Sequence, residues 1–193
     1  MAKILEKGKD FALLYKDAGE DSEKTAPSGM GVLYRLDMPV PGIIAAAASG
    51  SAFEIISKKY FLICSGRLEN ESGTMEDFLY HDPRSNRTFP VKKLRKGVKE
   101  AKLSYEVLAY DEKNDLSFVS AVLDTGRTHQ IRAQFASRRH PLAGDGKYGS
   151  RVKCPVALTC GEITYRPCAS SDEKTLRVMP EKNYPWDLFA DQF

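Results

Sequence analysis

Two runs of alternating side chains, joined by a short polar segment, constrain the fold of this chain most strongly. Small or apolar residues take every second position in residues 101–110, and a similar period of two continues in residues 116–123. This period puts alternate side chains on opposite faces of a strand. Because the connecting residues 111–115 are polar and few, the sequence predicts a β-hairpin.

Other short apolar runs predict a sheet with few helices. Strands are expected at residues 11–15, 31–36, 43–48, 60–65 and 78–81, with two more within residues 157–178. Helices are expected at residues 51–59, where Phe53 and Ile56 have helical spacing, and at residues 128–138, which end before His140-Pro141. We therefore expect a single α+β domain over residues 1–193, built on a mostly antiparallel mixed sheet.

The composition is that of a globular protein. Of the 193 residues, 42% are hydrophobic and 28% are charged. No segment approaches the roughly 18 apolar residues that a membrane-spanning helix requires, and the N-terminus does not resemble a secretory signal. The four cysteines contain no Cys-x-x-Cys pair, and the three histidines complete no zinc pattern. We expect a cytoplasmic protein with reduced cysteines and no bound metal.

The distribution of charge says more than the net charge of +3. Residues 84–102 hold one acidic residue, Glu100, and eight basic ones, namely Arg84, Arg87, Lys92, Lys93, Arg95, Lys96, Lys99 and Lys102. Taken alone, such a stretch is most often a solvated loop. The alternative is a contact with the phosphates of a nucleic acid.

Asp37 immediately precedes a rigid turn. Residues 38–42 read Met-Pro-Val-Pro-Gly, and each proline fixes φ and removes a backbone donor. Because the predicted strand at residues 31–36 ends here, we expect Asp37 to be presented to a cleft and held there. Arg35 lies two residues earlier and is expected on the same face of that strand.

Two segments of the chain together form a specific pattern. Residues 34–44 read Tyr-Arg-Leu-Asp-Met-Pro-Val-Pro-Gly-Ile-Ile, which resembles the His-Arg-Leu-Asp-x-x-Thr-Ser-Gly-Leu signature of the RluA-type RNA pseudouridine synthases. Residues 125–132 read Thr-Gly-Arg-Thr-His-Gln-Ile-Arg, as in the family, and residues 140–149 resemble its His-Pro-x-x-Gly-Asp-x-x-Tyr-Gly motif. Weaker similarities at residues 59–66, and at Lys-Asp-Ala-Gly in residues 16–19, extend the resemblance over about residues 10–180.

The resemblance implies a single pseudouridine-synthase-like catalytic domain that isomerises uridines of rRNA or tRNA. Asp37 would be the catalytic carboxylate, acting either as nucleophile or as a base. Arg132 would be its ionic partner, with a bidentate guanidinium that fixes orientation. Tyr60 would offer a ring for the flipped uracil and a hydroxyl for proton transfer. The reaction has no redox step or group donor, so the resemblance implies no cofactor.

The resemblance also implies residues that contact the RNA. Arg35 would hold the extruded nucleotide, Leu158 would line the pocket, and Arg127 belongs to the second motif. The resemblance also favours the interpretation that the basic stretch contacts RNA phosphates, through Lys92, Lys93 and Arg95. His129 and Gln130 are expected to form structural hydrogen bonds at the helix start. The turn that holds Asp145 and Tyr148 is expected to support the site.

The chain also departs from the family pattern. Tyr34 replaces a histidine, residues 39–41 replace the usual turn, and Leu158-Thr159-Cys160 replaces Leu-His-Ala. The altered turn motivates one alternative, a catalytically silent RNA-binding protein. A second alternative, a metal-dependent phosphohydrolase, is prompted by His81, Asp82, His129, His140 and Asp145.

RNA is the partner that the resemblance implies. About ten residues precede the first predicted strand, so we expect no S4-like RNA-binding domain in this chain. No exposed apolar stripe stands out, which favours a monomer.

Overall fold

The chain folds into two compact units in its computed structural model, which describes residues 2–192. The first unit holds the residues up to Tyr60 together with Thr159–Pro180. The second holds Phe61–Leu158 and the residues from Glu181 onward. Within the described residues, no helix is long and apolar enough to cross a membrane.

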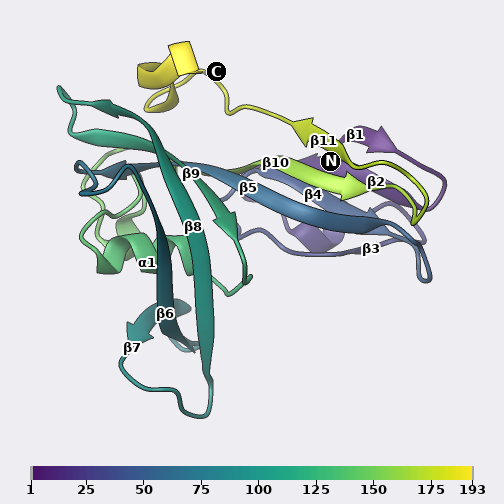
Figure 1. The fold of residues 1–193 in the computed structure, drawn as a ribbon, viewed down its shortest axis with the longest axis horizontal. Helices are drawn as coiled ribbons and strands as arrows, with labels where there is room; N and C mark the ends of the chain where they lie inside the picture. Colours follow the sequence, from purple (N-terminus) through teal and green to yellow (C-terminus); the bar gives the residue numbers. More distant parts are fainter. Residues whose placement is uncertain (1, 193) are drawn as a thin grey trace. The chain divides into compact units, whose positions relative to one another are not determined.

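The first unit is a sheet with almost no helix (Figure 1). Its elements are β1 (Lys3–Lys7), β2 (Phe11–Lys16), the short 3-10 helix η1 (Ser22–Thr25), β3 (Gly31–Val32), β4 (Gly42–Ala47), the first half of β5 (Glu54–Ser65), β10 (Leu158–Arg166) and β11 (Lys174–Arg177). The strand order is β1-β2-β4-β10-β5, with β11 beside β10 and β3 beside β4. β10 and β4 run parallel, whereas β1–β2, β2–β4, β3–β4 and β10–β11 are antiparallel.

The core of the first unit lies against β2 and β4. All six residues of β4 are buried, as expected for a strand that is covered on both faces. One face carries an aromatic cluster in which the ring centroids of Phe11 and Phe53 lie 4.6 Å apart, with Tyr165 beside them. The burial of this cluster holds β2, β4 and β10 in place.

The second unit is an antiparallel sheet with one α-helix (Figure 1). Its elements are the second half of β5, β6 (Ser72–Asp82), β7 (Arg87–Val91), β8 (Val98–Asp111), β9 (Leu116–Leu123), α1 (Gln130–Ser137), and the 3-10 helices η2 (Gly146–Tyr148) and η3 (Trp186–Gln192). The strand order is β5-β9-β8-β6-β7, and α1 packs against β6 and β7. Ile131 and Phe135 of α1 are buried, and the ring of Phe135 contacts that of Tyr105.

Most of the expected elements are present, and the mixed, mostly antiparallel sheet is confirmed. The predicted hairpin is formed by β8 and β9, which pair antiparallel from Leu103 opposite Leu123 to Asp111 opposite Leu116. The helix expected at residues 128–138 is α1. The strands β1 and β7 were not predicted, because both are short, β1 is rich in charged residues and β7 contains Pro90.

The helix expected at residues 51–59 is wrong, because β5 begins at Glu54. The spacing of Phe53 and Ile56 fits a helix, but two consecutive β-branched residues, Ile55 and Ile56, favour a strand. Their side chains lie on opposite faces: Ile55 packs against the core cluster, whereas Ile56 is 40% exposed.

The strand expected at residues 31–36 ends at Val32, so Asp37 lies in a loop and shares no strand face with Arg35. Side chains rather than a strand ladder hold this loop. The hydroxyl of Tyr34 donates to the carbonyl of Ile43 over 2.7 Å, and the amide of Leu36 donates to the hydroxyl of Ser22 over 3.1 Å. These bonds give the backbone an alternative to the sheet.

Candidate active site

Asp37 lies in a tight turn of the first unit, and the buried side chain of Lys16 holds that turn. The amide of Val40 donates to the carbonyl of Asp37 over 3.0 Å, which closes the turn. The ammonium of Lys16 donates to the carbonyl oxygens of Val40 at 2.9 Å, Met38 at 3.3 Å and Asp37 at 3.5 Å. A cation that satisfies three carbonyls of one turn restricts the backbone that presents the Asp37 carboxylate.

The pKa of the Lys16 ammonium depends on its burial and on the carboxylates around it. Burial lowers the pKa of its ammonium, and the nearby carboxylates of Glu20 and Asp37, followed by Asp17 and Asp21, oppose that shift. The side chain of Lys16 is fully buried, and a charge at such depth is retained only with partners of this kind. Its position in the Lys-Asp-Ala-Gly segment was the only sign of this role in the sequence.

Tyr60 and Asp37 lie close enough in the first unit to interact electrostatically. Burial raises the pKa of the Tyr60 phenol well above its usual range, and the Cys160 thiol and the Asp37 carboxylate act in the same direction. Tyr60 is only 6% exposed. Its side chain is therefore a neutral phenol at physiological pH, beside the carboxylate that the motif indicates.

The thiol of Cys160 interacts both with Tyr60 and with a second phenol, Tyr34. The hydroxyl of Tyr34 lies 3.8 Å from the sulfur of Cys160, and burial raises the pKa of that thiol to about 11. The ammonium of Lys58 lies 4.1 Å from the centre of the Tyr34 ring, within the range of a cation–π interaction. Two departures from the family pattern, at Tyr34 and Cys160, thus contact one another.

The position of Cys160 beside the loop that follows Asp37 depends on Gly42. Its φ is +136°, and a Cβ atom there would lie 2.5 Å from the carbonyl oxygen of Cys160. Only glycine permits the close approach of β4 to β10 at this point, and the approach brings Cys160 to the loop that follows Asp37.

Arg35, the remaining candidate near Asp37, is exposed. Its guanidinium lies 3.4 Å from the carboxylate of Glu23, and the two side chains are 71% and 62% exposed. A surface ion pair of this kind restrains an arginine only weakly.

Arg132 belongs to the second unit, where it forms a buried bidentate pair with Asp145. Its Nε and Nη2 atoms donate to the two carboxylate oxygens of Asp145 over 2.6 and 2.9 Å, and the side chains are 4% and 1% exposed. The Tyr148 ring centroid lies 5.1 Å from the guanidinium. The second motif thus supplies both the arginine and the residues that fix its orientation.

The other motif residues of the second unit form the expected supporting hydrogen bonds. His129, which precedes α1 with a left-handed backbone, places its Nδ1 atom 3.0 Å from the hydroxyl of Tyr148. The side-chain oxygen of Gln130 accepts from the amide of Arg127 over 3.0 Å and from the hydroxyl of Thr125 over 2.8 Å. Arg127 itself donates from Nε to the carbonyl of Glu100 over 2.9 Å.

The remaining candidates of the second unit differ in exposure. Leu158 is buried at the start of β10. Lys92, Lys93 and Arg95 are exposed in the loop between β7 and β8, and the guanidinium of Arg95 lies 5.9 Å from the ring centre of Tyr80. The three basic residues are therefore accessible to a large ligand such as a polymer. Leu158 could contact only a small group that inserts into the protein interior.

The residues that prompted a metal site do not converge. Across residues 2–192, no three His, Cys, Asp or Glu side chains are grouped so that they could hold a metal ion. His81 contacts the hydroxyl of Thr88, His140 contacts the carbonyl of Ser65, and Asp145 is paired with Arg132. This arrangement disfavours the metal-dependent phosphohydrolase.

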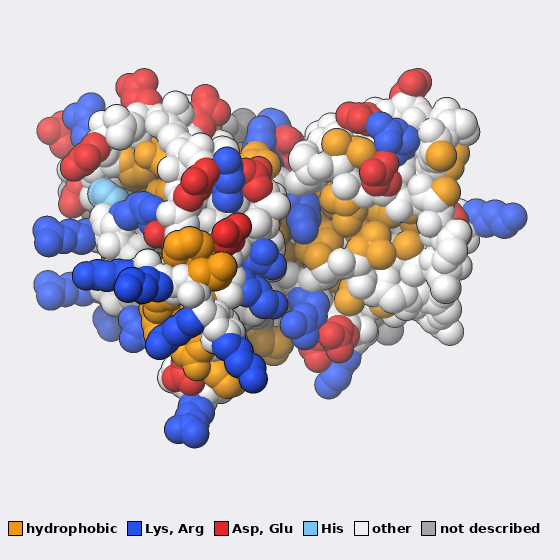
Figure 2. Space-filling view, turned by 60° about the horizontal axis from the view of Figure 1, so that its bottom comes forward, with side chains coloured by type: hydrophobic (Ala, Val, Ile, Leu, Met, Phe, Trp, Pro, Cys, Tyr) orange, Lys and Arg blue, Asp and Glu red, His pale blue; other side chains and the backbone are white. Residues whose placement is uncertain are grey.

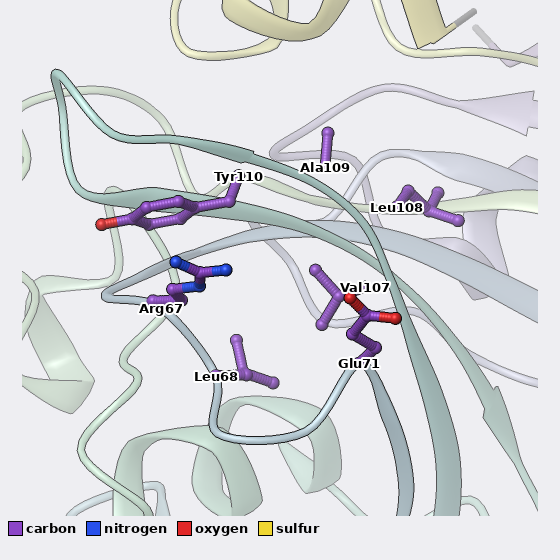
Figure 3. A pocket seen from close by; sticks show the side chains of 7 residues that line it. All are labelled: Arg67, Leu68, Glu71, Val107, Leu108, Ala109 and Tyr110. Carbon is purple, nitrogen blue, oxygen red and sulfur yellow. The ribbon is translucent and has the colours of Figure 1, made fainter.

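A pocket in the second unit lies at a bulge of β8 (Figure 3). It is lined by Arg67, Leu68, Glu71, Val107, Leu108, Ala109 and Tyr110. The register of β8 on β9 shifts between Val107 and Ala109, which opens this part of the strand. The guanidinium of Arg67 lies 5.5 Å from the ring centre of Tyr110, and none of the motif residues lines the pocket.

Comparison with known proteins gives consistent matches. A family model described as RNA pseudouridylate synthase matches residues 7–137. An RNA pseudouridine synthase of Bacillus subtilis is 34% identical over 131 residues, which is 63% of this chain and 42% of that protein. The ribosomal large subunit pseudouridine synthase D of Xylella fastidiosa is 30% identical over 158 residues, which is 77% of this chain and 44% of that protein. The matches thus span less than half the length of these relatives.

Two solved structures share the fold. The human RNA pseudouridylate synthase domain containing 1 aligns with a TM-score of 0.74 and 20% identity, over 96% of this chain and 86% of that one. The human RNA pseudouridylate synthase domain containing 4 aligns with a TM-score of 0.71 and 15% identity, over 93% of this chain and 89% of that one.

Proposed function

Because the chain belongs to the RNA pseudouridylate synthase family, whose model matches residues 7–137, we propose that it isomerises specific uridines of rRNA or tRNA to pseudouridine through the carboxylate of Asp37. In this reaction the bond from uracil N1 to ribose C1′ breaks, the base rotates, and C5 bonds to C1′. C5 loses a proton in this step and N1 gains one. The reaction has no redox step and no group donor, so we expect it to need no cofactor.

The observation that supports this proposal most strongly is the setting of Asp37. Its turn is held by the buried ammonium of Lys16, and the neutral phenol of Tyr60 lies close to it. A carboxylate acting at a sugar carbon needs a fixed direction of approach, which the three bonds from Lys16 provide. Asp37 would act either as the nucleophile at C1′ or as a base.

Tyr60 and Arg132 would have separate roles in support of Asp37. Tyr60, held as a neutral phenol, offers a ring face for the extruded uracil and a hydroxyl that donates a hydrogen bond. We assign Arg132 as the cation that keeps Asp37 ionised, and the bidentate bonds that it donates to Asp145 would set the orientation of its guanidinium.

The RNA would be held by basic residues of both units. Arg35 would contact the extruded nucleotide, Arg127 would contact the strand near it, and Leu158 would line the base pocket. The phosphates farther along the RNA would meet the exposed loop of Lys92, Lys93 and Arg95. The whole of residues 1–193 would act as one catalytic domain, as a monomer in the cytoplasm.

A catalytically silent RNA-binding protein is the second candidate. The observations that favour it are the altered turn at residues 39–41 and the substitution of Tyr34 and Cys160 for the family's usual residues. This candidate predicts affinity for RNA without formation of product.

Nucleoside analysis of RNA transcribed in vitro separates the two candidates, because such RNA contains no pseudouridine before treatment. After incubation with the protein, the RNA is digested and its nucleosides are separated by chromatography. The enzyme produces pseudouridine in rRNA or tRNA transcripts. If the RNA binds to the protein but no pseudouridine is detected in any transcript tested, the result would support the silent binder instead.

A further inference from the structure

The outer face of the β6–β7 hairpin carries a pair of aromatic rings. Tyr80 on β6 pairs with Phe89 on β7, and their ring centroids lie 5.7 Å apart. Their neighbours along the strands, Leu79 and Thr88, are buried on the other face. Because α1 packs against β6 and β7, alternation of side chains places the two rings on the face away from that packing.

These rings are accessible and are flanked by basic side chains. Phe89 is 39% exposed and Leu94, in the loop that follows, is 57% exposed. Tyr80 is half-buried, and the guanidinium of Arg95 lies 5.9 Å from its ring centre. Three charged side chains of the same loop, Lys92, Lys93 and Lys96, are also exposed.

The surrounding charge is strongly one-sided. Between residues 84 and 102 the chain holds eight basic residues against Glu100 alone. Figure 2 shows Lys and Arg side chains gathered around apolar side chains over this part of the second unit. A concentration of positive charge at this level favours a polyanion as ligand, and the exposed rings favour one with accessible flat bases.

We propose that Tyr80 and Phe89, termed here the aromatic platform, stack an unpaired base of the RNA while the loop of Lys92, Lys93 and Arg95 contacts its phosphates. This proposal rests on the proposed function in taking RNA as the ligand, and it adds an RNA contact in the second unit. Proteins that bind single-stranded nucleic acids combine these two elements, because bases stack on aromatic rings and phosphates pair with cations. In a duplex the base faces are stacked on one another, so the platform selects unpaired segments.

Fluorescence anisotropy with two probes tests the proposal. One probe is a fluorescein-labelled single-stranded RNA of mixed sequence, and the other is the same RNA annealed to its complement. The double variant Tyr80→Leu/Phe89→Leu keeps apolar volume but removes both rings. Its Kd for the single strand rises at least about fivefold, the low end of what stacking of one base contributes, whereas its Kd for the duplex is unchanged.

Salt dependence separates the rings from the charges. Stacking releases no counterions, so a plot of log Kd against log salt for the ring variant runs parallel to that of the native protein. The variant Lys92→Ala/Lys93→Ala gives a shallower slope, by about 0.7 for each lost phosphate contact on a single strand. Tyr184→Leu, which removes a ring that is 42% exposed elsewhere in the second unit, is the matched control and leaves both affinities unchanged.

The result that overturns the platform is a double ring variant that binds the single strand as tightly as the native protein, or one that loses affinity equally for both probes. Circular dichroism and the melting temperature establish that the ring variants fold, and Tyr80→Phe, which keeps the ring, retains native affinity.

Binding is measured without turnover, so it is independent of the proposed reaction. Pseudouridine formation with no effect of the ring changes on binding refutes the platform alone, whereas selective loss of single-strand binding without pseudouridine refutes only the catalytic proposal.

Discussion

The ammonium of Lys16 lies 2.9 Å from the carbonyl oxygen of Val40, at the end of the turn that begins with Asp37. It also donates to the carbonyls of Met38 and Asp37. A buried cation, rather than a strand, therefore fixes the backbone on which the catalytic proposal depends.

Replacement of Lys16 by methionine is expected to reduce both stability and activity. The buried bond to the carbonyl of Val40 is lost, and leaving such a group unsatisfied costs about 1–3 kcal/mol. The carbonyls of Met38 and Asp37 keep the backbone amides of Gly19 and Val40 as donors. Chemical denaturation measures the loss, and product formation falls with it because the Asp37 turn loosens. Lys24→Met, at an exposed lysine of η1, is the control and changes the free energy of unfolding by less than about 0.5 kcal/mol. A Lys16→Met protein as stable as this control would contradict the role of Lys16.

The thiol of Cys160 is expected to make stability depend on pH in the alkaline range. Burial raises its pKa from 9.0 to about 11 in the folded protein. The contribution is fully present below pH 9, and it is lost as the pH rises through about 11, because the unfolded thiol releases its proton first. The free energy of unfolding of the native protein therefore falls more steeply over this window than that of Cys160→Ala. Identical slopes in urea denaturation series would contradict the buried environment of the thiol.

The pair of Arg132 and Asp145 is expected to be costly to break. Asp145→Asn leaves a buried guanidinium without its carboxylate, and such a change typically costs about 3–5 kcal/mol. Glu76→Gln removes an exposed partner of Lys102, 2.8 Å away, and costs less than about 1 kcal/mol. Thermal or urea unfolding compares the two. Equal and small losses would show that the Asp145 pair contributes no more than a surface bridge.

The hydroxyl of Tyr60 is expected to act in the chemical step rather than in binding. Tyr60→Phe keeps the ring that we propose stacks on uracil and removes the hydroxyl. We expect kcat to fall by roughly 10²–10⁴-fold if the hydroxyl takes part in proton transfer, with KM little changed. A variant with native kcat would assign Tyr60 a packing role only.

The sequence predicted the elements whose patterns have one interpretation. The apolar run at residues 116–123 predicted β9 with the observed bounds, and the helix expected at residues 128–138 contains α1. The pattern at residues 51–59 was ambiguous, since Phe53 and Ile56 are spaced for a helix but belong to the start of an extended segment.

The features of the site that the sequence did not predict arise from contacts between residues far apart in the chain. Tyr34 and Cys160 are 126 positions apart, and only the parallel pairing of β4 with β10 brings them together. Lys16 is the last residue of the apolar strand β2, where a lysine normally extends into solvent. Its burial depends on the loop that folds back over it. Interactions of this kind are set by topology and leave no periodic signal in the sequence.

Tritium release from RNA labelled with [5-³H]uridine tests the central claim, that the Asp37 carboxylate carries out the isomerisation. Rearrangement exchanges the C5 hydrogen, so the native protein is expected to release tritium, whereas Asp37→Asn, which keeps the size and removes the charge, releases none while still binding RNA. Release by Asp37→Asn at the native rate would contradict the account.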